Sequence, residues 1–586
     1  RTGHAKKIYS DDGSFLRLEF SYDYDGDPNN NTWTLYFPDG SKVTGGGLSV
    51  GVTQRIYDRN ENYVEGLTDE FGRSVTISQN LNGDDEIRSK GVGGADDIVW
   101  TVKWKYLIVK KTYLSCVGGP GNCPNEDQIS NLDVVWNVVD TITEPVQMGG
   151  RTYTFSYNAH PYPNPPSGLS NGWGEVSGVS LPSGASIAYT YAWDGRNGST
   201  DNLELKEILK NYPTSKSVTY DAEYDGTTTP VTETWTYGTS YMGGSVGAPD
   251  GSSTLNSFYN TDANLWNAGL TYKTESSNGT KTERIWETNC PTACSAPFRF
   301  ANNPYVKTEF TSIKNAAGSY SLTSAKDFVY DKNGNVLRVY EYDWMPYSAV
   351  LRSGDDNPTG LPANAADYLK RITKTDYYND TPEASSTYYS DPQSYLLFVG
   401  QPLLRLPKSS EVQTAAGGTP VSRSEFVYDN SPSNPTLGNL TETKAWDSYK
   451  GGTFQAYTNP LIETNSITTS ATYNQYGMLL TSTDANGVVS SITYGDITTP
   501  AGPVSDLYPT QTVTASNYSA LKRTSTAAYD FYTGLVTTAT DLDNSVSLVT
   551  EYDALGRPIK VRNAANSPLE SWVRTEYNDT ARRVIV

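Results

Sequence analysis

Histidine, cysteine and methionine are scarce in this sequence of 586 residues, which holds 2, 4 and 4 of them. His4 lies near the start, and His160 lies in a proline-rich segment that cannot be a central strand. Neither belongs to an H-E-x-x-H motif, so nothing indicates a histidine-based metal centre. No apolar run approaches the ~18 residues that a membrane-spanning helix needs, so we expect no transmembrane segment.

Positive charge is also in deficit. The chain has 45 Lys and Arg against 65 Asp and Glu, which gives a net charge of −20 at pH 7. A surface of this sign repels nucleic acid and anionic lipid, so both are disfavoured as partners. The acidic residues are spread through the sequence rather than gathered in a tail, and solubility is the simplest reason for them.

Residues that suit strands and turns are abundant instead. The chain has 44 tyrosines and 50 glycines, with many serines and threonines in the same segments. Tyr and Thr favour strands, and Gly favours turns, so the composition predicts a protein built from β-strands. The chain is too long for one simple core.

A tyrosine-aspartate pair recurs near the end of the chain. Each of the first two pairs is followed by a glycine and then by alternating apolar and polar residues, the pattern of a turn followed by a strand. Self-similarity at such a period is typical of a repeat architecture. The pairs are Tyr529 with Asp530, Tyr552 with Asp553, and Tyr577 with Asn578.

The stretch YDALGRP (552–558) resembles the core of the RHS or YD repeat, which is found in rearrangement-hotspot proteins, teneurins and the shell subunits of Tc toxins. Similar units are YNQYGMLLTSTDANGVVSSITYGD (473–496) and FVYDKNGNVLRVYEYD (328–343). The resemblance is strong from about residue 320 onward and moderate before it. Its signature residues are Tyr330, Asp331, Tyr473, Tyr529, Asp530, Tyr552, Asp553, Gly556 and Arg557.

The resemblance implies an all-β fold in which an antiparallel YD-repeat sheet spirals into a shell or solenoid. We expect a less regular N-terminal repeat region over residues 1–300 and a regular shell over residues 301–586. Insertions at 345–367 and 446–465 are expected to form loops on one face. The Gly/Ser/Asn-rich segment 237–270 is expected to be a long loop.

In proteins with such repeats, the shell encloses a polypeptide, often a toxic C-terminal domain, or serves as an extracellular scaffold for adhesion. We therefore expect a non-catalytic, secreted or cell-surface scaffold that encloses or presents a polypeptide, or that contacts a surface receptor or glycan. One alternative is a delivery cage for a toxin effector beyond residue 586. Another is a carbohydrate-binding or carbohydrate-processing repeat protein.

Two features bear on these alternatives. The family's D-P-x-G-L-type junction, which carries the cleaving aspartate, is missing from the sequence. The sequence begins at Arg1 rather than at a methionine and ends within a repeat, so we expect it to be part of a longer polypeptide.

The four cysteines form two local pairs, Cys116 with Cys123 and Cys290 with Cys294, each in a loop-like segment. In an exported protein, such pairs predict two short disulfides. A four-cysteine zinc site is the alternative, but both pairs lack the usual Cys-x-x-Cys spacing.

The segment DYDGDPNNN places Asp23, Asp25 and Asp27 at alternate positions, where their carboxylates could bind calcium. The glycine of an EF-hand loop is not at its place, so an acidic hairpin turn is the simpler interpretation. No other cofactor is indicated.

Two stretches match the G-x-S-x-G motif, GLSVG (47–51) and GGSVG (243–247). A nucleophile elbow needs a helix after the serine, and neither stretch is followed by a helical pattern. Ser245 also has no histidine after it. A glycosidase pair of carboxylates stays open, because it is defined by separation in space. We expect no catalytic centre.

Overall fold

The structure is a computed structural model, and the described residues form a protein built almost entirely of antiparallel strands. They contain no α-helix, only short 3-10 turns, and no helix among them is long and apolar enough to cross a membrane. The all-β prediction is therefore confirmed. The described residues are 4–10, 13–22, 32–46, 54–94, 97–115, 128–158, 174–193, 211–222, 229–240, 242–259, 266–288, 303–331, 333–378, 403–414, 418, 420–499, 502–579 and 583–586.

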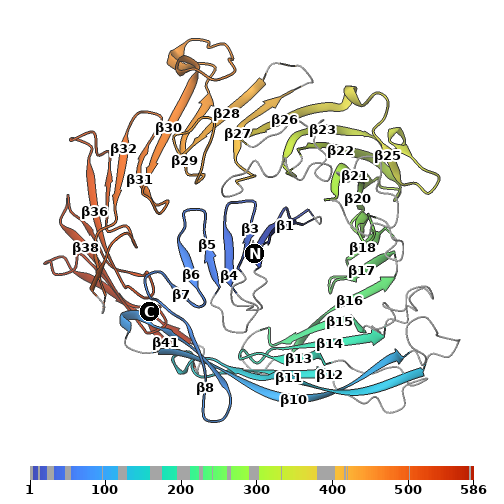
Figure 1. Cartoon of the computed structure of the whole chain (residues 1–586), viewed down its shortest axis with the longest axis horizontal. Coiled ribbons are helices and arrows are strands. Elements are labelled where there is room, and N and C mark those ends of the chain that lie inside the picture. The colour runs from blue at the N-terminus through green and yellow to red at the C-terminus, as the bar shows by residue number, and fades with distance from the viewer. Residues whose placement is uncertain are drawn as a thin grey trace.

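Most strands belong to one sheet that closes into a ring (Figure 1). Strands that follow one another along the chain are neighbours in this sheet, because short turns join most of them. The ring closes where β40 lies next to β8, which is followed by β9 and then by β10. In order, the strands are β8 (Thr76–Gln79), β9 (Asp85–Lys90), β10 (Asp97–Ser115), β11 (Gln128–Thr143), β12 (Thr152–Asn158), β13 (Glu175–Ser180), β14 (Ser186–Trp193), β15 (Asn211–Tyr220), β16 (Val231–Ser240), β17 (Gly243–Gly247), β18 (Ser253–Phe258), β19 (Thr271–Ser276), β20 (Thr280–Glu287), β21 (Tyr305–Lys314), β22 (Tyr320–Tyr330), β23 (Val336–Pro346), β26 (Leu369–Tyr377), β27 (Pro407–Gln413), β28 (Pro420–Tyr428), β29 (Leu440–Trp446), β30 (Ser466–Tyr473), β31 (Leu479–Thr483), β32 (Val489–Thr493), β35 (Gln511–Thr514), β36 (Arg523–Tyr529), β37 (Val536–Asp541), β38 (Val546–Tyr552), β39 (Pro558–Asn563) and β40 (Ser571–Arg574).

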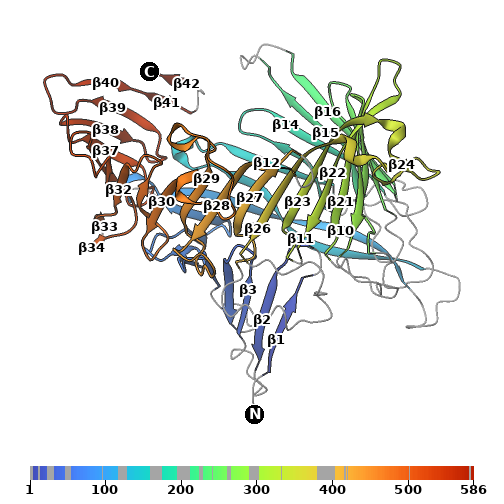
Figure 2. The ribbon, with the colours of Figure 1, turned by 90° about the horizontal axis from the view of Figure 1, so that it is seen from above.

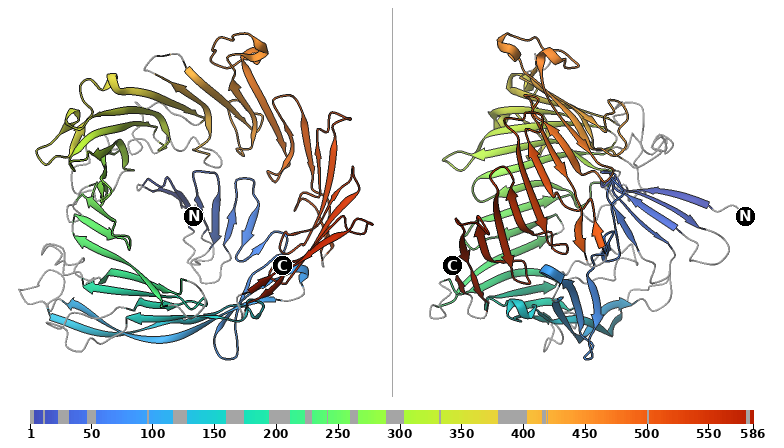
Figure 3. Two further views of the ribbon diagram at one scale, coloured as in Figure 1. Left: turned by 180° about the vertical axis from the view of Figure 1, so that it is seen from behind. Right: turned by 90° about the vertical axis from the view of Figure 1, so that its left-hand side faces the viewer.

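A second sheet, which we call the N-terminal sheet, lies across one opening of the ring. It is central when the ring is viewed face on (Figure 1), and it projects to one side of the ring in the perpendicular views (Figure 2 and the right panel of Figure 3). Its strands are β1 (His4–Tyr9), β2 (Arg17–Tyr22), β3 (Thr32–Tyr36), β4 (Lys42–Gly46), β5 (Arg55–Tyr57), β6 (Tyr63–Glu65) and β7 (Thr68–Asp69).

Three small hairpins and six 3-10 turns complete the described elements. The hairpins are β24 (Leu351–Arg352) with β25 (Pro358–Gly360), β33 (Ile497–Thr499) with β34 (Gly502–Val504), and β41 (Glu576–Asn578) with β42 (Arg583–Ile585). The turns are η2 (Val92–Gly94), η3 (Val146–Met148), η5 (Tyr347–Ala349), η6 (Ala365–Tyr368), η8 (Lys450–Gly452) and η9 (Glu463–Asn465).

The two predicted insertions lie on the outside of the ring (Figure 1). The first, between β23 and β26, packs Val350 against Phe310, Ala325 and Met345, and these four residues form a buried apolar cluster. The second lies between β29 and β30 and buries Leu461. The ring sheet forms a wall one layer thick, and such a wall can bury side chains only where a further segment covers it. The buried core is therefore local, found where such segments cover the wall.

Two expectations are modified by the strand pairing. Segment 237–270 is not one long loop, because it contains β17 and β18. The glycines of β17 serve close packing: a side chain at Gly247 would lie 2.5 Å from Thr236 Oγ1. The sheet also continues across residue 300, since β20 pairs with β21. The boundary expected between regions 1–300 and 301–586 is therefore not a break in the sheet.

Candidate functional site

The repeat tyrosines occupy one structural position. Tyr330, Tyr473, Tyr529 and Tyr552 are the last residues of β22, β30, β36 and β38, the strand-end position that the repeat pattern predicts. The strand register shifts at each of these tyrosines, because the strand that follows has one extra residue opposite it, a β-bulge. The bulge interrupts regular pairing, so the motif marks where each strand stops.

The residue after the tyrosine organises the turn that follows, which we call the YD turn. Asp553 Oδ1 accepts hydrogen bonds from the backbone N–H of Leu555 (3.0 Å) and of Arg557 (2.9 Å). Asp331 Oδ1 does the same for the residues two and four positions later, at 2.8 Å each. Gly556 has φ 81°, which glycine adopts without strain. The Asp and Gly of the signature are thus explained by turn geometry.

The tyrosine ties its strand to the start of the preceding one. The hydroxyl of Tyr552 donates to the carbonyl of Val536 at 2.8 Å, and that of Tyr473 donates to the carbonyl of Leu440 at 2.9 Å. Tyr529 reaches Pro509 in the same way at 2.9 Å, and burial raises the pKa of its phenol. A neutral phenol donates, so these tyrosines act as clamps between strands.

The arginine of the signature links two turns. Arg557 Nε donates to Asp553 Oδ2 at 2.6 Å, and Nη1 donates to Asp579 Oδ1 at 2.8 Å. The Arg557 guanidinium lowers the pKa of the Asp579 carboxyl below its ordinary value. Its charge also lies 4.4 Å from the ring centre of Tyr577.

The turns of the N-terminal sheet dock on the turns of the ring in chain order. At the first contact, the N–H of Gly13 donates to Asn303 Oδ1 at 2.8 Å. Phe15 is buried against Gly334, in the YD turn after β22. At the next contact, the N–H of Leu404 donates to the carbonyl of Pro38 at 2.9 Å.

The third contact involves the turn between β5 and β6. Asn439 Nδ2 donates to Asn60 Oδ1 at 3.1 Å, and Asn62 Nδ2 donates to the carbonyl of Tyr476 at 3.0 Å. A side chain at Gly477 would lie 2.2 Å from Asn60 Nδ2, so the YD turn after β30 must present a glycine here.

The last contacts follow β7. Arg73 ends the sequence DEFGR (69–73), which resembles DALGR (553–557), and its Nε donates to Asp69 Oδ2 at 2.7 Å. Its Nη1 donates to the hydroxyl of Tyr508. Within the ring itself, the N–H of Gly93, in η2 between β9 and β10, donates to Asp530 Oδ2 at 2.6 Å. The rim of the ring therefore receives polypeptide turns through backbone groups, amides and glycines.

The inner face of the ring carries a charge ladder over five strands. Its members are direct cross-strand partners that alternate in sign: Arg284, Glu309, Lys326, Glu341 and Arg371. Arg284 and Glu309 are 2.9 Å apart, and Lys326 and Glu341 are 3.6 Å apart. The hydrogen bond from Arg371 lowers the pKa of Glu341. Opposite charges as cross-strand partners stabilise the sheet and leave little net field.

The outer face carries two buried clusters beneath the insertions. Under the first insertion, Arg352 donates to both oxygens of Glu283 at 3.0 and 2.9 Å, and Lys281 Nζ lies 3.0 Å from the same carboxylate. Under the second, Arg423 Nη1 donates to Glu411 Oε2 at 3.1 Å. Burial, together with a hydrogen bond to Glu411, raises the pKa of Tyr457 to about 12. These groups hold the insertions on the wall.

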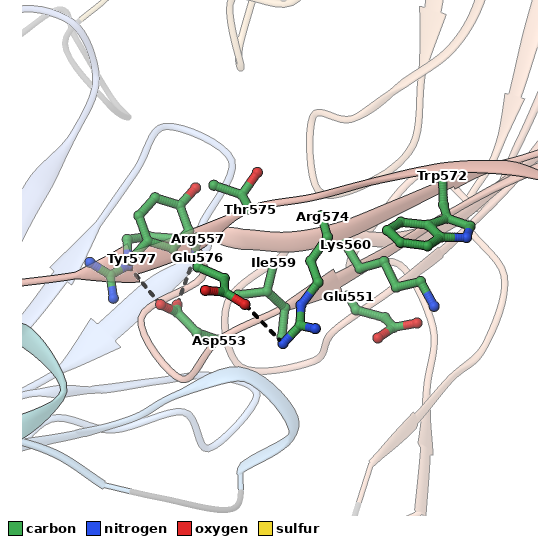
Figure 4. A pocket seen from close by; sticks show the side chains of 10 residues that line it. All are labelled: Glu551, Asp553, Arg557, Ile559, Lys560, Trp572, Arg574, Thr575, Glu576 and Tyr577. Carbon is green, nitrogen blue, oxygen red and sulfur yellow. Dashed lines mark hydrogen bonds and ion pairs between the residues drawn. The ribbon is translucent and has the colours of Figure 1, made fainter. Parts of the chain in front are cut away.

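A third stretch of wall is hollow rather than covered. A cavity of about 730 Å³ lies at the last repeats, with Asp553 and Arg557 at one end and Trp572 at the other (Figure 4). Lys560 Nζ lies 5.3 Å from the ring centre of Trp572. Arg574 and Glu576 form an ion pair at 3.3 Å.

The structure gives no chemical role to the described catalytic candidates. Ser245 lies within β17, whose pairing partners are β16 and β18, so GGSVG is a strand and not an elbow before a helix. Within the described residues, no group of three or more His, Cys, Asp or Glu could hold a metal ion. Several candidates lie outside the described residues and stay predictions: GLSVG (47–51), His160, Asp23, Asp25, Asp27, Cys116, Cys123, Cys290 and Cys294.

Sequence reasoning missed the rim contacts and Trp572. A signal existed for Arg73, because DEFGR repeats the DALGR motif. No local signal marked Asn60, whose partner Asn439 is 379 residues away in the chain. Trp572 lies in an ordinary strand sequence, and only the fold shows that it borders a cavity.

No protein-family model matches the chain, and no curated protein matches its sequence. Among solved structures, it is similar to TcdB2-TccC3 without hypervariable C-terminal region (11% identity, TM-score 0.37, 94% of this chain and 31% of that chain). It is also similar to TcdB2-TccC3-Cdc42 (10% identity, TM-score 0.43, 95% and 33%). A third is the Photorhabdus luminescens Tc holotoxin pore (12% identity, TM-score 0.27, 94% and 23%). The chain spans about a third or less of these chains.

Proposed function

We propose that this chain is a non-catalytic β-shell scaffold, exported or displayed at a cell surface, whose ring holds a polypeptide. The resemblance of its turns to RHS repeats supports this function. The closed ring, with the N-terminal sheet at one opening, supports it as well, because a closed wall leaves few strand edges for unwanted pairing.

The observation that carries the proposal is the turn-by-turn docking of the N-terminal sheet. Its successive turns meet successive turns of the rim, from Phe15 on Gly334 to Arg73, after β7, on Tyr508. These contacts use shape and hydrogen bonds from backbone, amide and arginine groups. A rim built in this way is suited to holding polypeptide.

The inner face is suited to the same task. The charges of the ladder are paired within the wall, so they neither attract nor repel a polypeptide strongly. An enclosed chain would then be confined by the wall rather than bound tightly to it.

Protease protection tests the proposal. A protease-sensitive reporter polypeptide is fused after Val586, and its cleavage is compared in the parent and in a Gly334→Val, Gly477→Val variant. The two substitutions collide with Phe15 and Asn60, and they release the N-terminal sheet. We expect protection in the parent and cleavage in the variant. A Gly487→Val control, which has a similar φ of 76° but open space, should keep the protection. Equal cleavage of the reporter in all three proteins would refute the enclosing role.

Other experiments separate the remaining alternatives. The coding sequence after residue 586 distinguishes a toxin delivery cage from an adhesion scaffold. A glycan hydrolysis screen tests the absence of catalysis, because a carboxylate pair would act there. Mass spectrometry of the intact protein tests the two disulfides, and calcium titration tests the segment from Asp23 to Asp27.

A further inference from the structure

The outer face of the wall is covered by an insertion at some repeats and left open at others. Arg423 and Glu425, which contact the second insertion, precede Tyr428 by five and three residues. Ser547 and Val549 stand at the same distances before Tyr552. Because side chains alternate along a strand, Ser547 and Val549 face outward as well.

The strand register extends this outer face across the last repeats. Val549 pairs with Arg562, and Arg562 pairs with Trp572. Lys560 likewise pairs with Arg574. Directly opposed residues share a face, so Arg562, Lys560, Trp572 and Arg574 all point outward.

This open stretch differs in chemistry from the covered ones. Beneath the first insertion, the wall offers Phe310 and Met345, both 0% exposed, to an apolar segment. At the last repeats, the wall offers charged groups and one aromatic residue, Trp572, which is 57% exposed. A polypeptide segment of the kind that covers the other stretches would find no apolar pocket here.

We propose that the cavity at the last repeats binds a neutral oligosaccharide. The C–H groups of one pyranose face meet the indole of Trp572, whose π face is negative. Hydroxyl groups of the sugar both donate and accept, and the cavity supplies partners of both kinds in Lys560, Arg574, Glu551 and Glu576. A cavity with a few convergent polar groups around an aromatic surface is typical of a small-ligand site.

The charge balance favours a neutral ligand over an anionic one. Arg574 is paired with Glu576, and Arg557 is paired with Asp553 and Asp579. The cations of the cavity are therefore largely matched by carboxylates, and no net positive field attracts an anion. The inference concerns the outer face, so it does not depend on a polypeptide inside the ring.

Binding to defined glycans tests the inference with the full 586-residue chain. The probes are cellohexaose, laminarihexaose, maltohexaose and chitohexaose, measured by titration calorimetry and by tryptophan fluorescence. We expect saturable binding of at least one probe at millimolar or lower concentration. Trp572→Ala should weaken it about tenfold or more, and Trp572→Phe should weaken it less, because it keeps an aromatic surface.

Two controls make the test specific. Trp136→Ala removes a tryptophan that is 53% exposed on β11, outside the cavity, and it should leave binding unchanged. Circular dichroism confirms that each variant keeps its strands. The inference is overturned if no probe binds, or if Trp572→Ala binds as the parent does. Two further ligands test the alternatives: a heparin hexasaccharide as an anionic sugar, and a peptide of residues 347–368 as a polypeptide segment. Binding of only one of these two ligands, and of no neutral probe, would also overturn the inference.

Discussion

The ring of Phe15 occupies the space that a side chain at Gly334 would need. A Cβ on Gly334 would lie 2.3 Å from a carbon of that ring, and Phe15 itself is only 9% exposed. The two residues are far apart in the chain, yet their contact joins the N-terminal sheet to a YD turn. A glycine of the repeat thus serves both the turn, with φ 75°, and the docking.

Gly334→Ala should release the start of the N-terminal sheet. The positive φ costs roughly 1 kcal/mol for any L residue, and the added methyl must also displace Phe15. We expect faster hydrogen exchange in β2. Gly487→Ala is the matched control, since Gly487 has φ 76° and nothing within 4 Å. If both variants changed exchange in β2 equally, the contact would not hold the sheet.

The recurring tyrosine-aspartate units made much of this fold predictable. A register shift occurs at Tyr552, Asp553 accepts a hydrogen bond within the turn, and Gly556 has a positive φ. Each of these features depends on neighbouring residues, so the local sequence is enough to place a strand end and a turn. Similar local information predicted the two insertions, because they interrupt the repeat.

The N-terminal sheet could not be predicted in the same way. Its strands have the same hairpin pattern as the wall, and only distant contacts such as that of Asn60 with Asn439 distinguish a sheet across the opening from more wall. Glycine was also ambiguous. In β17 it allows close packing, as at Gly247 beside Thr236, where a loop was expected.

Arg352→Ala should destabilise the protein by about 3–5 kcal/mol, because it leaves the carboxylate of Glu283 with fewer partners while that residue is 1% exposed. Replacing both residues, as Glu283→Gln with Arg352→Met, should cost less than the single change. Lys370→Ala removes an ion pair to Asp343 that is largely exposed, and it should cost no more than about 1 kcal/mol. Urea unfolding compares the variants. Equal losses in Arg352→Ala and Lys370→Ala would contradict a stabilising role of the buried contact between Arg352 and Glu283.

Glu341→Gln should flatten the acid limb of the stability curve. Arg371 lowers the pKa of Glu341 in the folded protein, below the ~4.3 of an unfolded glutamate. The ionised group therefore stabilises the fold above that unfolded value, and this contribution is lost as the pH falls through the lowered folded pKa. The variant should be less stable than the parent at pH 7, by no more than about 1 kcal/mol, because the ladder is partly exposed. The difference should vanish near pH 2. Urea titrations between these limits measure it, and a difference that persisted in acid would have another cause.

Tyr552→Phe should cost about 0.5–1.5 kcal/mol, because it removes the 2.8 Å hydrogen bond to the carbonyl of Val536 and keeps the ring. The matched change is Tyr577→Phe, whose 3.2 Å bond to Pro558 is exposed, so water can replace the lost donor at little cost. Hydrogen exchange in β37 should rise only in the first variant. If Tyr552→Phe were as stable as the parent, the repeat would require an aromatic ring at the strand end and not a donor. The tyrosine would then act by packing, and the clamp between successive strands would have to come from the bulge and the turn alone.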